Sequence, residues 1–500
     1  MKHLIHNGAL IPKRPEWRKL HISVQGKRID LTPEQEEMAV AWVTKLGTAY
    51  VEDPVFIENF FLDFRKALGT KKKVPPEDFN FSPVIKQVER EKAYKLSLTK
   101  EEKKKLAAER KAIREKNKEK HGVAIVDGIK VEVGNYTVEP SSIFMGRGDH
   151  PLRGRWKRGA GKSDIILNLS PDAPRPPGNW KEILWQQNSM WIAKWDDKLR
   201  GKEKYIWLAD SSPIKQQKDI EKFNKAIELG RKIEEVRKHI LSNLDADEVT
   251  IRKIATVCYL VDALKLRVGD EKDTDEADTV GATTLRSDHI TFGKNGVVIF
   301  DFLGKDAVRW QKRIRPPKQV VDNIKEFMKS AMSSIFEGVG SKNVSLFLDE
   351  VAPGVSAKVF RTYHASRVVA DFLNSSDISK PDPEYEKKHV ATMANLEAAI
   401  ICNHKRKPRK NWEESLVKKM ERLKKLRARN TPSAKKRAKI LQSKINAFRE
   451  TRDYNLGTSL KSYIDPRIYY KWGQKVDFDW KLYYPKALQK KFSWVERETV

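Results

Sequence analysis

The chain has 500 residues and carries 99 Lys and Arg against 68 Asp and Glu, a net charge of +31. This length exceeds what one hydrophobic core usually supports, so two or more domains are expected. The positive charge is spread along the whole sequence, as in proteins that bind a polyanion, and nucleic acid is the first candidate. A membrane partner is disfavoured, because no apolar run approaches the about 20 residues of a spanning helix and no signal-peptide pattern opens the chain.

Only two cysteines are present, Cys258 and Cys402. Each lies in an apolar, helix-like stretch, which indicates a reducing, intracellular compartment and argues against a thiolate metal cage. His404 lies close to Cys402, but the sequence offers no second ligand pair. Neither a metal ion nor another cofactor is therefore expected.

The first 85 residues mix prolines, aromatic residues and short apolar runs, and helical segments are predicted on either side of a turn at Asp53-Pro54. From Lys86 to Lys120 aromatic residues become rare and charges recur at helical spacings. This pattern predicts a solvated helix pair. A projecting basic arm that faces DNA is the alternative.

Residues 121–212 are richer in Gly, Pro, Ile and Val, and strands and loops are predicted there. They include MGRGDHPLRGRWKRGAGK, residues 145–162, which has almost no apolar side chain to bury. Glycine lets a backbone approach a phosphate and arginine supplies forked donors, so loops of this composition commonly contact phosphates. Alone, the composition is a weak indication.

A charged helix is predicted over 215–240. The next helix is predicted to stop near Gly269, which puts Arg267 at its C-terminal end. The stretch DHITFGKNGVVIFDFLGKDAVRWQKRI then shows three apolar bursts separated by GKNG and LGKDA, which predicts a three-stranded antiparallel meander with Lys305 on its second turn. One face of the second helix is expected to carry Ile251, Ile254, Ala255, Cys258 and Val261.

Apolar residues three and four apart predict three more helices, in QVVDNIKEFMKSAMSSIF, AKVFRTYHASRVVADFL and EKKHVATMANLEAAIICNHKRKP. Arg361 lies in the second of these and His404 near the end of the third. Two basic helices follow over 410–449, and a turn at Asn430-Thr431-Pro432 predicts that they form an antiparallel hairpin. Its seam is expected to place Leu416, Met420, Leu423 and Leu426 against Ile440, Leu441 and Ile445.

Four polar residues, Arg267, Lys305, Arg361 and His404, lie at the ends of apolar elements, and Tyr463 lies in a separate C-terminal segment, LGTSLKSYIDPRI. Singly, each has a plain structural explanation as an ion-pair partner, a solvated lysine, a cap or a packed ring. Together they fit the displacement of a 5′ hydroxyl from a phosphodiester by a phenol. The arginines would bind the non-bridging oxygens, Lys305 would be the general acid, and His404 would be a further donor. A phenol is protonated at neutral pH, so the nucleophile must be activated at the phosphate.

Five segments resemble, in order and wording, the eukaryotic-type (type IB) DNA topoisomerases: LRVGDEKDTDEADTVGATTLR, FDFLGKDAVRW, AKVFRTYHAS, AAIICNHKRKP and LGTSLKSYIDPRI. The resemblance covers nearly the whole chain and implies an α+β, multidomain protein that closes around DNA as a clamp. A mixed DNA-binding cap region would span 1–212, and a mainly helical catalytic domain with a small antiparallel sheet would span 213–408. A coiled-coil linker hairpin over 409–449 would lead to a small C-terminal domain, 450–500, with the active-site tyrosine.

The resemblance implies an isomerase that nicks one strand of double-stranded DNA through a 3′-phosphotyrosyl intermediate and relaxes positive and negative supercoils without ATP or metal. Tyr463 would be the nucleophile, and Arg267, Arg361 and His404 would contact the scissile phosphate. Lys305 would be the general acid and would touch a base edge in the minor groove.

The same resemblance implies that Arg147, Lys157 and Asp306 contact DNA near the cut. A monomer is expected, acting on the chromosome inside the cell. The compartment would be the cytoplasm or nucleoid of an archaeon, or the nucleus of a eukaryote.

The sequence departs from the family pattern in two respects. Ser462 precedes the predicted nucleophile where the family commonly has asparagine, which puts sensitivity to camptothecin-type poisons in doubt. The chain starts almost at the cap-like region, without the long basic extension of eukaryotic relatives, so an archaeal member and a trimmed eukaryotic one stay open as alternatives.

Two other functions stay open. A tyrosine recombinase uses a similar set of residues, but it would not explain the cap-like and linker-like segments. A non-enzymatic architectural DNA-binding protein, in which Tyr463 only packs, would explain the charge and nothing else.

Overall fold

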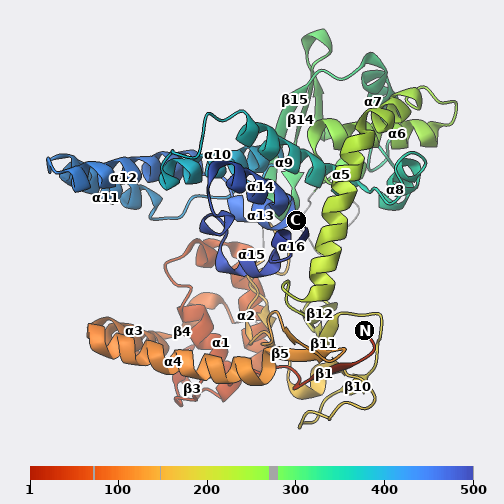
Figure 1. Ribbon diagram of the computed structural model, residues 1–500. Coiled ribbons are helices and arrows are strands. Elements are labelled where there is room, and N and C mark those ends of the chain that lie inside the picture. Colours follow the sequence, from red (N-terminus) through yellow and green to blue (C-terminus); the bar gives the residue numbers. More distant parts are fainter. Residues whose placement is uncertain (71–73, 147, 270–279, 499–500) are drawn as a thin grey trace. The chain divides into compact units, whose positions relative to one another are not determined.

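The computed structural model describes residues 1–70, 74–146, 148–269 and 280–498 (Figure 1). These residues form two compact units, unit 1 over 1–215 and unit 2 over 216–498. Helices and mainly antiparallel sheets occur in both units, which confirms the predicted α+β, multidomain class. Over the described ranges, none of the helices is both long and apolar enough to cross a membrane.

The first core of unit 1 is an aromatic cluster on one helix. Phe56, Phe60, Phe61 and Phe64 recur three and four residues apart on α2 and are fully buried. Each buried phenylalanine contributes about 1.5–3 kcal/mol to folding, and Trp42 stacks on Phe60 at 4.6 Å. The helices of this part of unit 1 are α1 (Pro33–Val43), α2 (Pro54–Leu68), α3 (Ser82–Ser97) and α4 (Lys100–His121), and its small sheet has the order β3 (Lys27–Asp30), β2 (His21–Val24), β4 (Phe79–Asn80).

The predicted solvated helix pair is confirmed as α3 and α4. Thr99 and Glu102 form a capping box that starts α4, because each side chain bonds the other residue's backbone N–H. Val84 is the one buried residue among those described in α3, and α4 has none.

Strands dominate the second half of unit 1, as predicted for residues 121–212. One sheet is antiparallel throughout, and a second is antiparallel except for its edge strand β10, which runs parallel to β9. Alternating side chains of both sheets, such as Ile165 and Leu167 on β9, form a second core. The first sheet has the order β1 (Leu4–His6), β5 (Val123–Val126), β6 (Ile129–Glu132), the second has the order β10 (Glu182–Leu184), β9 (Ile165–Asn168), β11 (Trp191–Asp197), β12 (Lys202–Trp207), and β7 (Ser142–Ile143) pairs with β8 (Trp156–Lys157).

Unit 2 contains the predicted three-stranded antiparallel meander. Its central strand β14 pairs with β13 and β15, and Val298, Phe300 and Phe302 on one face of β14 are buried. These side chains belong to a core shared with the surrounding helices. The elements are β13 (Ile290–Phe292), β14 (Val298–Gly304) and β15 (Val308–Ile314), with α5 (Pro213–Ser242), α6 (Val249–Leu264), α7 (Lys318–Ser330) and α8 (Ser341–Asp349).

A second core of unit 2 joins the C-terminal helices to α9 and α10. Trp472 and Tyr469 pack against the small side chains of α10, and the hydroxyl of Tyr469 donates to the carbonyl of Ala391 over 3.0 Å. This packing fixes the segment that carries Tyr463 against the helices that carry Arg361 and lead to His404. The elements are α9 (Ala357–Asn374), α10 (Glu384–Ile401), α13 (Leu456–Ser462), α14 (Pro466–Val476), α15 (Lys486–Lys491) and α16 (Val495–Glu498).

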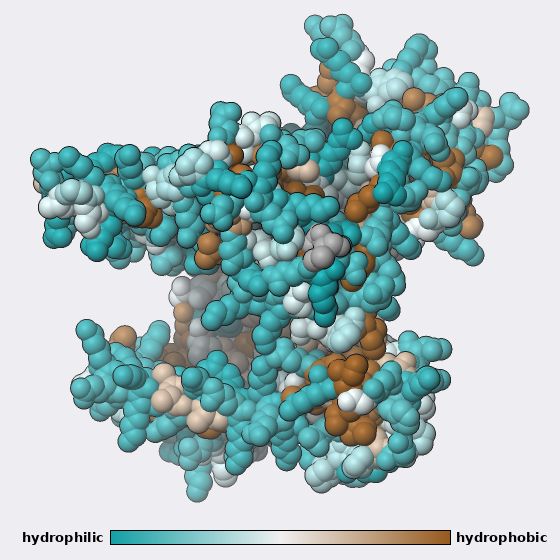
Figure 2. All heavy atoms as spheres, in the orientation of Figure 1, coloured by the Kyte–Doolittle hydropathy of each residue, from teal (hydrophilic) through white to brown (hydrophobic). Residues whose placement is uncertain are grey.

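The predicted basic hairpin is present as α11 (Trp412–Arg427) and α12 (Pro432–Glu450), which lie side by side (Figure 1). Its seam differs in part from the prediction: Leu423, Ala438 and Ile445 are buried, while Met420 is 44% exposed. The Met420 sulfur instead accepts a hydrogen bond from Arg449 at the hairpin's side. Because this apolar seam is narrow, the surface of the hairpin is largely hydrophilic on the face drawn in Figure 2.

Candidate active site

Arg267 lies three residues beyond the end of α6, and not at the C-terminal end of the helix as predicted. Helix α6 ends at Leu264, because Lys265 has a left-handed φ of 59° that cannot continue a helix. Beyond this residue, the carbonyl of Arg267 accepts from the N–H of Ala282 over 2.8 Å. Arg267 is thus held by backbone pairing rather than by a helix end.

Lys305 is on the turn between β14 and β15, as predicted. The turn is a single 3-10 segment, Lys305–Ala307, and Ala307 adopts a left-handed φ of 55°. The Lys305 side chain is exposed, so its amine can reach a bound molecule.

Arg361 is in the second turn of α9 and is only 5% exposed. Its Nη2 donates to the carbonyl of Cys402 over 2.8 Å. Its Nε is buried without a hydrogen-bond partner among the described residues. A buried guanidinium with an unused donor is suited to bind an oxyanion.

His404 follows a helix that ends three residues earlier than its position. Asn403 adopts φ 54° and the N–H of His404 donates to Ala399 over 2.8 Å, which together form a Schellman-type helix end. Helix α10 therefore stops at Ile401 and does not include His404, contrary to the predicted extent. The turn points His404, which is 8% exposed, back toward α9.

Tyr463 lies at the junction of two helices. Its N–H donates to the carbonyl of Ser459, 2.9 Å away, at the end of α13, and Asp465 caps the start of α14. The hydroxyl of Ser366 on α9 donates to the Tyr463 carbonyl over 3.2 Å and accepts from the N–H of Asp465 over 3.0 Å. Tyr463 is therefore tied through its backbone to the helix that carries Arg361.

The predicted catalytic residues converge in unit 2. The Arg361 guanidinium carbon is 4.9 Å from the centre of the Tyr463 ring, and its Nη2 is 3.3 Å from His404 Nε2. The rings of His404 and Tyr463 have centres 5.2 Å apart. Arg267, Lys305, Arg361 and His404 also line one cavity.

Burial, more than the nearby cations, disfavours the charged form of His404. Burial lowers the pKa of His404 to about 3, and repulsion from Arg361 and Arg267 acts in the same direction. Burial, and then the charge of Arg361, also lowers the pKa of Arg267, while attraction to and a hydrogen bond with Tyr463 oppose that shift. A bound phosphate would offset this mutual repulsion, so the cavity is arranged for an anion.

Two contacts that sequence reasoning missed tie the turn of His404 to the sheet that carries Lys305. Lys312 Nζ on β15 donates to the Ile401 carbonyl over 3.1 Å, and Asn403 Nδ2 donates to the Arg309 carbonyl over 3.1 Å. Neither residue stands in a pattern that sequence alone would single out. Among the residues that the structure describes, no group of three or more His, Cys, Asp or Glu side chains is placed to hold a metal ion.

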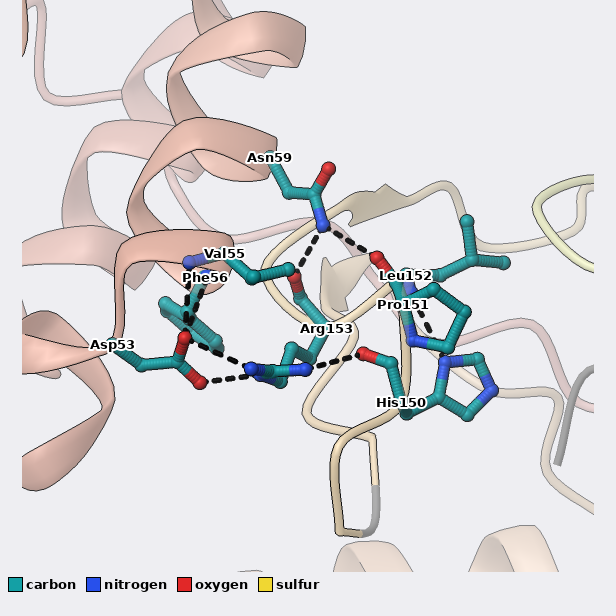
Figure 3. A network of polar contacts seen from close by, with 8 residues as sticks. All are labelled: Asp53, Val55, Phe56, Asn59, His150, Pro151, Leu152 and Arg153. Carbon is teal, nitrogen blue, oxygen red and sulfur yellow. Dashed lines mark hydrogen bonds and ion pairs between the residues drawn. The ribbon is translucent and has the colours of Figure 1, made fainter. Parts of the chain in front are cut away.

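The Gly- and Arg-rich loop is in unit 1, where it is docked on α2 (Figure 3). Arg153 forms a forked ion pair with Asp53, the residue that caps α2. Asn59 Nδ2 donates to the carbonyls of Pro151 and Arg153, each over 2.8 Å. Gly154 has φ 92°, and a Cβ there would lie 2.1 Å from the carbonyl oxygen of Phe56, so this close approach requires glycine.

The predicted DNA contacts near this loop are only partly described. Arg147 lies outside the described residues, as does the side chain of Asp306. Lys157 is described and is 12% exposed, because its amine is paired with Glu139 and, over 3.1 Å, with the buried carboxylate of Asp197.

Lys157→Met is expected to lower the free energy of unfolding by about 3 kcal/mol, because the buried Asp197 carboxylate would lose its cation. Chemical denaturation of the full chain measures this change. The control is Lys198→Met, which removes a 61% exposed partner of Asp164 and should cost under about 0.5 kcal/mol. Two results together would instead assign Lys157 to a phosphate: unchanged stability, and a plot of log binding constant against log salt concentration whose slope is shallower by about 0.9.

Comparison with known protein families shows which family the chain belongs to. Family models match residues 211–437 to the catalytic core of eukaryotic DNA topoisomerase I, residues 1–208 to its DNA binding fragment, and residues 435–499 to a C-terminal topoisomerase domain. Human DNA topoisomerase 1 is 32% identical over 544 residues, which cover 99% of this chain and 70% of the human protein. The chain belongs to the eukaryotic DNA topoisomerase I family.

This membership confirms the type IB topoisomerase resemblance predicted from the sequence. Another relative, Arabidopsis thaliana DNA topoisomerase 1 beta, is 36% identical over 539 residues and 99% of this chain. The Drosophila melanogaster topoisomerase 1 is 33% identical over 98% of it. The chain spans 58% and 53% of the lengths of these two topoisomerases, respectively.

Proposed function

We propose that this chain is a type IB DNA topoisomerase that nicks one strand of double-stranded DNA and relaxes positive and negative supercoils. The observation that carries the proposal is the convergence of Arg361, His404 and Tyr463, with Arg361 Nη2 3.3 Å from His404 and its guanidinium carbon 4.9 Å from the Tyr463 ring. Arg267 and Lys305 line the adjacent cavity. Guanidinium groups in such a cavity would stabilise the charge that builds on non-bridging oxygens.

Tyr463 and Lys305 would carry out the bond and proton changes, while Arg267, Arg361 and His404 would contact the scissile phosphate. The Tyr463 hydroxyl oxygen attacks the phosphorus, its proton passes to solvent, and the bond to the 5′ oxygen breaks while Lys305 protonates that oxygen. The product is a 3′-phosphotyrosyl diester and a free 5′ hydroxyl. Because this diester keeps the energy of the broken bond, the 5′ hydroxyl can reverse the step without ATP. The protein's own cations take the part that metal ions play in many phosphoryl-transfer enzymes.

The proposal extends to the organisation of the chain. Residues 1–212 would be the DNA-binding cap region, 213–408 the catalytic core, 409–449 the linker and 450–500 the C-terminal domain, closing around duplex DNA as a clamp. Arg147, Lys157 and Asp306 would contact DNA near the cut, although Lys157 would first have to exchange its carboxylate partners. The enzyme would act as a monomer on chromosomal DNA inside the cell.

Supercoiled plasmid incubated with the full chain in EDTA, without ATP, tests the proposal. Relaxation of both positively and negatively supercoiled plasmid is the expected result. Binding and bending of DNA without relaxation would overturn the proposal in favour of an architectural protein, and recombination between two marked plasmids would favour a tyrosine recombinase.

A further inference from the structure

The two ring nitrogens of His404 have different partners. Nε2 lies 3.3 Å from Nη2 of Arg361, and Nδ1 lies 3.2 Å from the hydroxyl oxygen of Ser459. A guanidinium only donates hydrogen bonds, so Nε2 accepts and carries no proton. In a neutral ring the proton is then on Nδ1, and the Ser459 hydroxyl accepts it.

This tautomer is the wrong one for the proposed reaction. A donor to a phosphoryl oxygen bound at Arg361 needs the proton on Nε2, the nitrogen that faces Arg361. A protonated ring would supply both donors, but burial and the two nearby arginines lower the pKa of His404 to about 3. Burial, the largest cause of that lowered pKa, persists when a phosphate binds and offsets the arginine charges. A neutral ring then donates to the phosphate only if its proton is on Nε2.

We propose that Ser459 is a positioning residue that allows His404 to change tautomer when the scissile phosphate enters the cavity. The phosphate oxygen replaces His404 Nε2 as the acceptor of the Arg361 N–H, and Nε2 is then free to bind a proton. One proton leaves Nδ1 and one is taken up at Nε2 by exchange with solvent, so the ring stays neutral. The Ser459 hydroxyl rotates from acceptor to donor and satisfies the bare Nδ1.

The position of Ser459 supports this role. It is fully buried, so no bulk water replaces its hydroxyl beside the ring. A hydroxyl can donate or accept in place by rotation, whereas a carboxylate only accepts and an ammonium only donates. The Ser459 carbonyl also accepts the N–H groups of Tyr463 and Ile464, over 2.9 and 3.1 Å. One residue thus contacts both the donor histidine and the backbone of the nucleophile.

The inference rests on the proposed function, and two measurements keep the two separate. The first is the 15N shift of the ring nitrogens in histidine-labelled protein, with His404 assigned by loss of its signals in His404→Gln. The DNA-free chain should carry its proton on Nδ1. The non-cleaving Tyr463→Phe chain bound to a DNA duplex should carry the proton on Nε2. In the Tyr463→Phe, Ser459→Ala double variant bound to the same duplex, the proton should not move completely to Nε2.

The second measurement is single-turnover cleavage of a DNA duplex. Ser459→Ala should cleave about 10- to 100-fold more slowly than the unchanged chain, of the order seen when one transition-state donor is impaired, with little change in DNA affinity. Ser459→Cys, which nearly keeps the volume but is a weak hydrogen-bonding group, should be intermediate and covers the case that the alanine variant folds poorly. Ser375→Ala, at the exposed end of α9, is the control and should cleave normally.

Two results would overturn the inference while the proposed function stands: normal cleavage by folded Ser459→Ala and Ser459→Cys, or the same His404 tautomer with and without DNA. Absence of cleavage and relaxation by the unchanged chain would overturn the proposed function itself. The ring shifts of the DNA-free chain would still report whether Nδ1 carries the proton.

Discussion

Tyr463→Phe is expected to abolish relaxation, with a loss of at least about 10⁴-fold, because the ring keeps its packing but loses the only atom that can bond to phosphorus. The ring contacts with Arg361 and His404 involve the aromatic face, which phenylalanine retains. The hydrogen bond between the phenol and Arg267 is lost, so the free energy of unfolding should fall by about 1 kcal/mol, and DNA affinity should change little. Plasmid relaxation and trapping of the protein–DNA covalent complex under denaturing conditions measure the loss.

The matched control is Tyr470→Phe on α14, which removes a phenolic hydroxyl from the same C-terminal helices. This residue is partly buried against the same core, so the two variants share the chemistry of the change and differ in position. Relaxation should persist in Tyr470→Phe. A Tyr463→Phe protein that still relaxes plasmid would remove this residue from the mechanism.

Arg361→Ala is expected to slow single-turnover cleavage by about 10²- to 10³-fold, since it removes a preorganised donor to the phosphoryl oxygens. The same substitution removes the bond to the Cys402 carbonyl, so a fall in stability is expected as well. Arg361→Lys keeps the charge but loses the forked geometry, and it should restore only part of the rate. Rapid-quench cleavage of a labelled duplex, with thermal denaturation in parallel, separates the two effects.

Arg367→Ala is the control for the same helix. Arg367 is 60% exposed and pairs with Asp371 and the Tyr363 hydroxyl, so its loss should leave the cleavage rate near that of the unchanged chain. If both variants lose cleavage equally, the defect would lie in α9 as a whole. Arg361 would then have no specific part in phosphate binding.

Much of the local structure was predictable because it depends on side chains close in sequence. The alternating bursts between Asp288 and Ile314 predicted the meander, since every second side chain of a strand faces the core. The charged stretch after Lys86 predicted exposed helices, because it has too few apolar side chains to bury a face. Helix ends were less predictable: Lys265 and Asn403 end helices by adopting positive φ values, a choice that the packing around them imposes.

The sequence by itself determined the basic character of the chain, its family, and the residue types available for phosphate chemistry, because these follow from composition and from motifs read in order. Only the tertiary structure decided which atoms meet. Ser366, Ser459 and Lys312 emerged as neighbours of the site because hydrogen bonds join them to residues as many as 97 positions away. The tertiary structure also pairs Lys157 with two carboxylates, Glu139 and Asp197. The physical reason is that a hydrogen bond or ion pair requires a separation of about 3 Å in space, which spacing along the chain does not specify.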